Sequence, residues 1–372
     1  MNQNKLKILY ITQKVDLNDH VLGAIHSYLF SLAGQVEKLY IVCLFKGRVE
    51  LPSNCEVFSL GKEVGNNRWQ YLKNFYGFVL PLIFNKKING IFVHMNEIYV
   101  YLLSPFRLLL KINHIGLIWW KAHAKLNGRA KFARHFVDRV LTSVSVAFNV
   151  KTNKRRVVGQ GIDTDKFQPS NDVAVDSQTL KIISIGRVSP VRKYELLLKA
   201  LAEVLKNQPQ ILIQSKVYGA TIAQGDDSYL QELLALRQKL GLDKVVEFMG
   251  AVSNWQLPKL INEANFVVNP GGSNSLDKSI VEAMAVGKIV VDSNAATSEI
   301  LLPSELTEAE KQLFVFARED YLDLAKKITN IINLPIQQRQ AIGLKLRDLV
   351  VKYHNVNHLS QEIVNTFNQL IN

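Results

Sequence analysis

The stretch LKIISIGRVSPVRKYELLLKAL (180–201) decides the fold of the second half of the chain. It starts as a short apolar run with three isoleucines, Gly186 interrupts the run, and apolar residues then recur at helical spacing. A strand that leads through a turn into a helix is the repeating unit of parallel α/β sheets. The unit recurs downstream, with predicted strands at 211–219, 245–250, 265–271 and 288–293 and predicted helices at 194–206, 228–240, 255–263 and 279–286.

The first half of the chain repeats this pattern. Its predicted strands are continuous apolar runs, which indicate a parallel sheet covered on both faces. A polar interval, FQPSNDVAVDSQT (167–179), separates the two halves and is typical of a linker. The predicted elements of this half are strands at 8–12, 38–45, 90–95, 114–120, 139–144 and 155–160 and helices at 23–34 and 68–85.

The fold class that follows is α/β, with two tandem Rossmann-like doubly wound domains facing a cleft. A length of 372 residues agrees with two domains, because one hydrophobic core rarely serves so long a chain. We predict an N-terminal domain at 1–170, a C-terminal domain at 171–345, and a helical segment at 346–372 that packs back on the first domain. Open sheets bind ligands beyond the carboxyl ends of their strands, so we expect the function in the cleft.

Cysteine content and hydropathy restrict the compartment. Cys43 and Cys55 are too few for a disulfide framework or a cysteine-rich zinc site, and they suit a reducing cytoplasm. The apolar run near the N-terminus is too short for a signal peptide, and the apolar stretch 77–84 is too short to span a bilayer. We therefore expect a cytoplasmic protein that contacts a membrane only peripherally, at the inner face of the plasma membrane.

The charge of the chain belongs to its first half. Residues 1–170 hold 24 Lys+Arg and 10 Asp+Glu, whereas residues 171–372 hold 21 and 22. Basic residues alternate with aromatic ones at 68–78 and at 121–136, which suits an anionic lipid surface. The alternative is a solvated basic face. We expect no nucleic-acid partner, because no recognised nucleic-acid module accompanies the charge.

Two segments of the second half suggest an anion site. Arg187 follows Gly186 at the end of a strand, and Arg192 and Lys193 follow at short range, so the turn can clamp a diphosphate without a metal. The alternative is an ordinary basic turn before a helix.

The second segment, VVNPGGSNSLDKSIVEAMAVGKIVV (267–291), contains a glycine-rich turn and the start of a helix, whose N–H groups attract anions. Glu282 lies one turn into that helix and can accept hydrogen bonds from sugar or ribose hydroxyls. The alternative is a capping box with Ser279.

Together the two segments resemble the donor-binding half of retaining GT-B glycosyltransferases of family 4, the group 1 transferases. GRVSPVRK (186–193) is similar to the family's G-R-x-S-P-x-K element, VEFMGAV (246–252) to its F-x-G element, and EAMAVG (282–287) to its E-A-M-A-x-G element. The resemblance implies a nucleotide diphosphate sugar as substrate, no metal and no other cofactor. It assigns Arg187 to the diphosphate and Glu282 to the ribose, and it leaves Arg192 and Lys193 as alternatives for the second phosphate contact.

The chain departs from the family pattern eight residues before Glu282. Asn274 stands where the family has the first Glu of an E-x7-E pair, which is usually placed near the transferred sugar. An amide cannot ionise, so a role that needs negative charge falls to Asp277 or is absent. The resemblance counts the whole turn as donor-binding, namely Asn274, Ser275, Leu276, Asp277 and Lys278.

The first domain resembles the family more loosely, as an acceptor domain would. Gly23 lies where members have a glycine-rich acceptor loop, and His123 follows a strand where members commonly place a histidine at the catalytic cleft. His94 also follows a strand and is a second acceptor-side candidate, with a packed histidine as the alternative. VVGQGIDTDKF (157–167) is similar to the family's hinge segment, in which we expect Asp163 to cap the chain.

The resemblance implies transfer of a sugar to a hydroxyl of a glycan or lipid-linked acceptor with retention at the anomeric carbon. His123, Arg187 and Asp277 are the catalytic candidates. A non-catalytic sugar-nucleotide-binding or scaffold protein is the alternative, because of Asn274. A nucleotide-dependent oxidoreductase is less favoured, because no G-x-G-x-x-G follows the first strand.

Overall fold

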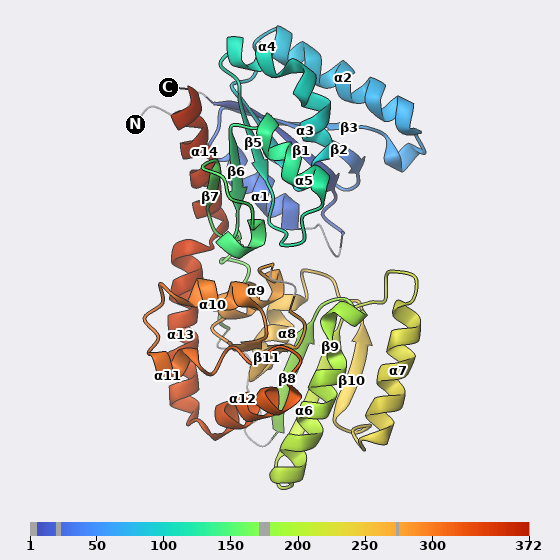
Figure 1. The fold of residues 1–372 in the computed structure, drawn as a ribbon, viewed down its shortest axis with the longest axis vertical. Helices are drawn as coiled ribbons and strands as arrows, with labels where there is room; N and C mark the ends of the chain where they lie inside the picture. Colours follow the sequence, from blue (N-terminus) through green and yellow to red (C-terminus); the bar gives the residue numbers. More distant parts are fainter. Residues whose placement is uncertain (1–5, 20–23, 171–178, 273–274, 372) are drawn as a thin grey trace. The chain divides into compact units, whose positions relative to one another are not determined.

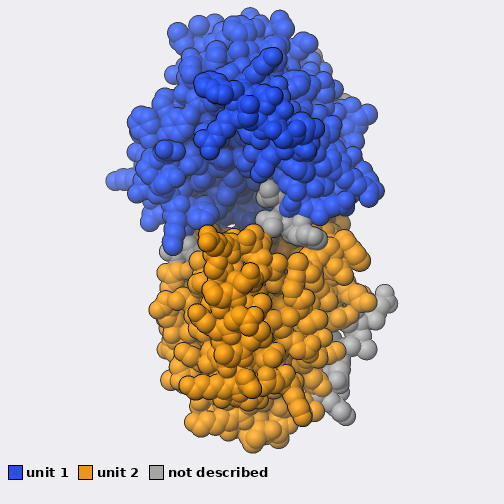
Figure 2. Space-filling model, turned by 90° about the vertical axis from the view of Figure 1, so that its right-hand side faces the viewer, with its two compact units in different colours: residues 1–161, 355–372 blue, residues 162–354 orange. Residues whose placement is uncertain are grey.

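The computed structural model describes residues 6–19, 24–170, 179–272 and 275–371 (Figure 1). The chain forms two compact units (Figure 2). Unit 1 comprises Met1–Gly161 and Asn355–Asn372, and unit 2 comprises Ile162–His354. Within the described ranges, no helix has both the length and the apolar character needed to cross a bilayer.

Unit 1 is built on a seven-stranded sheet in the order β3-β2-β1-β4-β5-β6-β7, in which every pair is parallel. Its strands are β1 (Lys7–Val15), β2 (Lys38–Lys46), β3 (Cys55–Ser59), β4 (Gly90–His94), β5 (Gly116–Trp120), β6 (Arg139–Thr142) and β7 (Arg155–Val157). Its helices are α1 (Ala24–Ala33), α2 (Arg68–Phe84), α3 (Ile98–Leu103), α4 (Arg107–Ile112), α5 (Gly128–Ala133) and α14 (Val356–Ile371).

The central strands of unit 1 contain continuous apolar runs, such as Ile8–Ile11 in β1, because both faces of the sheet are covered. Along β1, Ile8 and Tyr10 pack in the core that α1 and α14 close, whereas Leu9 and Ile11 pack in the core of α2, α3, α4 and α5. Side chains alternate between faces along a strand, so two cores require a continuous apolar run. The prediction of a sheet covered on both faces is confirmed.

The C-terminal helix α14 is part of unit 1. Phe367 is fully buried and lies over Gly90 and Gly116, and a Cβ atom added at Gly90 would lie 2.5 Å from Cδ1 of Phe367. The two glycines therefore leave the groove that the ring fills. At the edge of the helix, Arg156 forms an ion pair with Glu362 over 2.7 Å.

Unit 2 is built on a five-stranded parallel sheet in the order β10-β9-β8-β11-β12. Helix α12 packs on α6, and α13 packs on α9. The strands are β8 (Thr179–Ile185), β9 (Leu212–Tyr218), β10 (Val246–Gly250), β11 (Phe266–Asn269) and β12 (Ile289–Asp292). The helices are α6 (Tyr194–Asn207), α7 (Asp226–Lys239), α8 (Leu257–Glu263), α9 (Lys278–Ala285), α10 (Ala295–Leu301), α11 (Glu308–Lys311), α12 (Tyr321–Asn333) and α13 (Ile336–Tyr353).

The two units divide at a different place from the one that composition predicts. The boundary lies after Gly161 rather than after residue 170, because the chain from Ile162 to Phe167 already packs in unit 2. Phe167 is buried and its carbonyl accepts a hydrogen bond from Arg347 Nη1 over 3.0 Å. The chain returns to unit 1 at Asn355 rather than at residue 346. Of the predicted linker, residues 171–178 lie outside the described residues.

Candidate functional site

The carboxyl ends of the five parallel strands of unit 2 lie at one edge of its sheet, and three of these ends are closely followed by a glycine. Gly186 follows β8, Gly219 follows β9, and Gly271 follows β11. A Cβ atom at Gly219 would overlap the carbonyl of Gly186, and one at Gly271 would lie 2.5 Å from the carbonyl oxygen of Val191. The glycines thus let the three turns approach one another closely, which explains their place in the sequence. This edge is where open α/β sheets bind ligands.

Arg187 is exposed at this edge. It forms no ion pair with any described carboxylate, although it lies near Asp226. The pKa of Asp226 is lowered chiefly by the backbone N–H groups of Ala223 and Ile222 and further by the guanidinium of Arg187. Arg187 is therefore a cation held beside the strand end and open to solvent, as a ligand for phosphate must be.

Arg192 and Lys193 are adjacent in sequence but differ in surroundings. Arg192 donates to both carboxylate oxygens of Asp277, and its Nη1 also donates to Oδ1 of Asn269 over 3.3 Å. Burial lowers the pKa of Arg192, but pairing with Asp277 outweighs burial and raises it. Lys193 has a positive φ of 52°, its side chain is 40% exposed, and its ammonium lies 3.5 Å from the carboxylate of Glu319.

The carboxylate of Asp277 is hydrogen-bonded to side chains within unit 2. Its Oδ2 accepts from Asn269 Nδ2 over 3.2 Å in addition to the Arg192 contact, and its side chain is 15% exposed. A carboxylate with these partners does not offer a free negative charge. The geometry argues against the predicted catalytic role of Asp277 at the transferred sugar.

Glu282 is almost completely buried in α9. Its Oε1 lies 3.1 Å from Lys278 Nζ, one helical turn away, without the alignment of a hydrogen bond. The capping-box alternative is wrong, because Asp277 is the N-cap of α9 and the Ser279 hydroxyl donates to the carbonyl of Ile185 over 3.1 Å. A buried carboxylate oxygen that lacks a hydrogen-bond donor is suited to a ligand hydroxyl.

The turn before α9 is held by residues that the sequence did not single out. Asn294 Nδ2 donates to the carbonyl of Ser275, and Arg318 Nη2 donates to the carbonyl of Gly272. Leu276 is buried. Asn274, the departure from the family pattern, lies outside the described residues. Arg318 is 46 residues away from Gly272, so no local motif could have indicated it.

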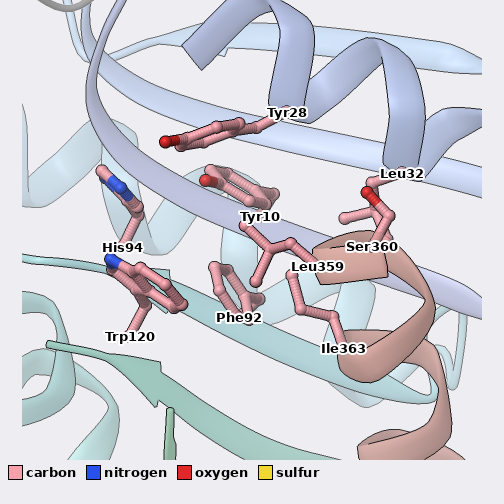
Figure 3. A pocket seen from close by; sticks show the side chains of 9 residues that line it. All are labelled: Tyr10, Tyr28, Leu32, Phe92, His94, Trp120, Leu359, Ser360 and Ile363. Carbon is pink, nitrogen blue, oxygen red and sulfur yellow. The ribbon is translucent and has the colours of Figure 1, made fainter. Parts of the chain in front are cut away.

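In unit 1, His94 ends β4 and lies in a small pocket (Figure 3). Its Nδ1 is 3.4 Å from Oγ1 of Thr12, and burial lowers its pKa to about 4. The pocket volume is about 10 Å³, room for one water and not for a sugar. The other lining residues are Tyr10, Tyr28, Leu32, Phe92, Trp120, Leu359, Ser360 and Ile363.

His123 lies three residues beyond β5 and is exposed. Its Nδ1 accepts from the backbone N–H of Lys125 over 3.2 Å, which orients the ring and leaves Nε2 directed elsewhere. Gly23, the acceptor-loop candidate, is outside the residues that the structure describes. Over the ranges that the structure does describe, no three His, Cys, Asp or Glu side chains are grouped so as to hold a metal ion.

Comparison with known proteins agrees with the resemblance. Residues 165–346 match the family model of the glycosyl transferases group 1. A D-inositol 3-phosphate glycosyltransferase of Corynebacterium jeikeium is 27% identical over 163 residues, which are 41% of this chain and 39% of that protein. A second such enzyme, from Catenulispora acidiphila, is 29% identical over 143 residues, 36% of this chain and 33% of that protein. The match thus spans between a third and two fifths of these relatives.

Solved structures match over both units. Anabaena Alr3699/HepE in complex with UDP has a TM-score of 0.73 and 17% identity, covering 98% of this chain and all of that one. Sucrose-phosphate synthase from Thermosynechococcus elongatus has a TM-score of 0.76 and 15% identity, with 98% and 99% coverage. The predicted fold class is confirmed: the chain has two Rossmann-like α/β domains of the GT-B glycosyltransferase fold.

Proposed function

We propose that this chain, which has the GT-B glycosyltransferase fold, moves a sugar from a nucleotide diphosphate sugar to a hydroxyl of a glycan or lipid-linked acceptor, with retention at the anomeric carbon. The observation that carries the proposal is that two groups of opposite charge, which do not contact each other, lie at the same sheet edge of unit 2. Arg187 is an exposed cation there, and Glu282 is a buried carboxylate with an acceptor oxygen that lacks a hydrogen bond. A diphosphate and a ribose hydroxyl are the complements of these two groups.

The chemical demand lies on the leaving group. Breaking the sugar–phosphate bond builds negative charge on the diphosphate, and a cation already in place stabilises that charge in the transition state. We assign this to Arg187 and expect no metal. His123 orients the sugar in our proposal. We infer that the acceptor attacks the face from which the diphosphate departs.

Turnover of candidate donors tests the proposal. Purified protein is incubated with UDP-, GDP- and ADP-sugars and a mixed glycan and lipid acceptor extract, and released nucleotide is measured. UDP-sugars are the first choice, because the Anabaena structure holds UDP. Replacing one transition-state donor typically costs about 100-fold or more in turnover, which we expect for Arg187→Ala. Lys206→Ala, an exposed lysine of α6, is the matched control. Binding without release would favour the scaffold alternative, and wild-type turnover in Arg187→Ala would refute the clamp.

We place the acceptor at an anionic membrane surface, on the following observation. Between Val64 and Val137 the chain has eleven Lys+Arg and one acidic residue, Glu97. Glu97 is paired with Lys121 over 2.9 Å, and Arg107 is paired with Asp138. Eight further cations in this stretch are exposed, and none has a described carboxylate within ion-pair distance: Arg68, Lys73, Lys86, Lys87, Lys111, Lys125, Arg129 and Lys131.

Exposed apolar side chains accompany these cations. The ends of α2 and α4 lie side by side, since Asn113 Nδ2 donates to the carbonyl of Ile83 over 3.3 Å. Phe84, Leu108 and Ile112 are exposed on this pair of helices, and Trp69 at the start of α2 is 81% exposed. Cations beside exposed rings and aliphatic chains suit an interface of anionic headgroups and acyl chains.

Tryptophan fluorescence separates this surface from unspecific adsorption. On adding phosphatidylglycerol vesicles we expect a blue shift that Trp69→Phe removes. Trp255→Phe is the matched control, because Trp255 is 74% exposed but lies in unit 2. The shift should weaken as salt rises, since exposed charges are screened beyond about 10 Å at 0.1 M salt. An equal shift with neutral phosphatidylcholine vesicles, or its persistence in Trp69→Phe, would remove the membrane from the proposal.

A further inference from the structure

Three strand ends of unit 2 and the start of α9 are joined by a polar network. Arg192 binds Asp277 through Nη1 and Nη2, and Asn269 links Asp277 to the next strand. Asn269 Nδ2 donates to Oδ1 of Asp292 over 3.1 Å, and Thr297 donates to the other oxygen of Asp292 over 2.6 Å. The network thus connects the turn after β8 with the ends of β11 and β12 and the start of α9.

The network leaves Arg192 without charge to offer a ligand. A carboxylate bound in fork geometry neutralises the guanidinium and uses the two nitrogens that would grip a phosphate. Truncating one partner of such a buried pair leaves the other uncompensated, so the pair holds its elements together strongly. Arg192 also fits closely against the turn after β11, since a Cβ atom at Gly271 would lie 2.6 Å from its Cα.

Lys193 stands in contrast to its neighbour. It is the N-cap residue of α6 and lies in the left-handed backbone region, with φ 52° and ψ 39°. Its two carboxylate neighbours are loosely placed, with Glu195 at 4.0 Å and Glu319 at 3.5 Å. Glu319 is itself 76% exposed, and exposed pairs of this kind contribute little. An arriving phosphate can therefore compete for the ammonium of Lys193.

We propose that Arg192 is a positioning residue, which fixes the start of α9 through Asp277, and that Lys193 is the second cation of the diphosphate site. The inference rests on the proposed function, because it assigns different roles to two cations of the same donor site. Asp277 then serves as the anchor of Arg192 rather than as a group at the sugar.

Isothermal titration with UDP, GDP and ADP tests this division on the whole chain. Lys193→Ala removes a charge-assisted hydrogen bond and should weaken binding of the tightest of the three nucleotides about 10-fold or more. Lys206→Ala should bind as the wild type does. Asp277→Asn should also weaken binding, because Arg192 loses its anchor. Arg192→Lys should not restore it, because an ammonium cannot reproduce the fork.

If Arg192 and Lys193 had the opposite roles, the substitutions would have the opposite effects on nucleotide binding. If Arg192 were the phosphate ligand, Asp277→Asn would release its charge and leave binding equal or tighter, and Lys193→Ala would have no effect. A merely structural network would lower the unfolding midpoint of Asp277→Asn and leave its binding constant at 10 °C unchanged, which also overturns the inference. If Asp277→Asn does not fold, unchanged binding in Lys193→Ala still overturns it. Wild-type protein that binds none of the three nucleotides refutes the proposed function itself.

Discussion

Asp292 should make the stability of unit 2 fall as pH rises. Burial is the main reason that the pKa of Asp292 is raised to about 7, and the nearby charge of Asp277 adds to it, against the hydrogen bond from Thr297 and the charge of Arg192. In the folded state the carboxyl is therefore neutral at pH 5, whereas in the unfolded chain it is ionised. The folded state binds the extra proton, so the contribution is complete below pH 3.8 and is lost as pH rises through about 7.

The size of this effect follows from the two pKa values. A shift from 3.8 to about 7 corresponds to about 4 kcal/mol in full. About 2.5 kcal/mol of it falls between pH 5 and pH 8. Asp292→Asn removes the titration and keeps the shape, since the amide oxygen can accept from Asn269 while its NH₂ donates to the Thr297 hydroxyl.

Urea denaturation at pH 5 and pH 8 measures the effect. The free energy of unfolding of the wild type, minus that of Asp292→Asn, should fall by about 2.5 kcal/mol from the lower to the higher pH. Asp348→Asn changes an exposed aspartate of α13 and controls for general charge effects. A difference that stays constant between the two pH values would show that the carboxyl does not titrate in this window, and the reasoning from burial would fail.

Three further perturbations test the units separately. Phe367→Ala should lower the free energy of unfolding of unit 1, measured by thermal unfolding, by about 3–5 kcal/mol. Phe84→Ala, at an exposed site, should change it by less than about 0.5 kcal/mol. Gly271→Ala should abolish nucleotide binding in the titrations above, because its Cβ meets the backbone of the Arg192 turn, and wild-type affinity would mean that this turn adjusts. Burial lowers the pKa of His94 to about 4, so the free energy of unfolding should fall as pH falls from 6.5 to 4. His94→Gln should reduce this pH dependence of the free energy of unfolding. An unchanged pH dependence in the variant would contradict the reasoning.

The sheets were predictable because burial leaves a local trace. Strands covered on both faces need near-continuous apolar runs, and β1, β5 and β11 show such runs in the sequence. The edge strand β3 (Cys55–Ser59) was missed, because it is only partly buried and Glu56 interrupts its apolar pattern. Helices α3 and α4 were missed for another reason, since each has six residues, too few for an amphipathic period to be recognised.

The site was predictable only where one segment supplies the chemistry. Arg187 and Glu282 could be proposed from the sequence because each lies in a motif of a few residues. Asn269 and Asp292 look like ordinary polar ends of apolar strands, and only the order of the strands makes them partners: β11 and β12 are neighbours, and the parallel register places Asn269 beside Asp292. Sheet order is a global property, so a network that crosses strands has no local signature.

A cationic side chain can bind a ligand only where its charge is not already paired within the protein. Arg192 and Lys193 are consecutive cations, and no count or motif distinguishes them. The backbone does: η5 (Pro190–Arg192) turns the Arg192 side chain toward Asp277, and the left-handed Lys193 that follows breaks the turn and starts α6 in a new direction. Two neighbouring residues on opposite sides of such a break face different surroundings. In this chain the basic pair is thus expected to consist of one cation, Arg192, that holds the site together and one, Lys193, that binds the ligand.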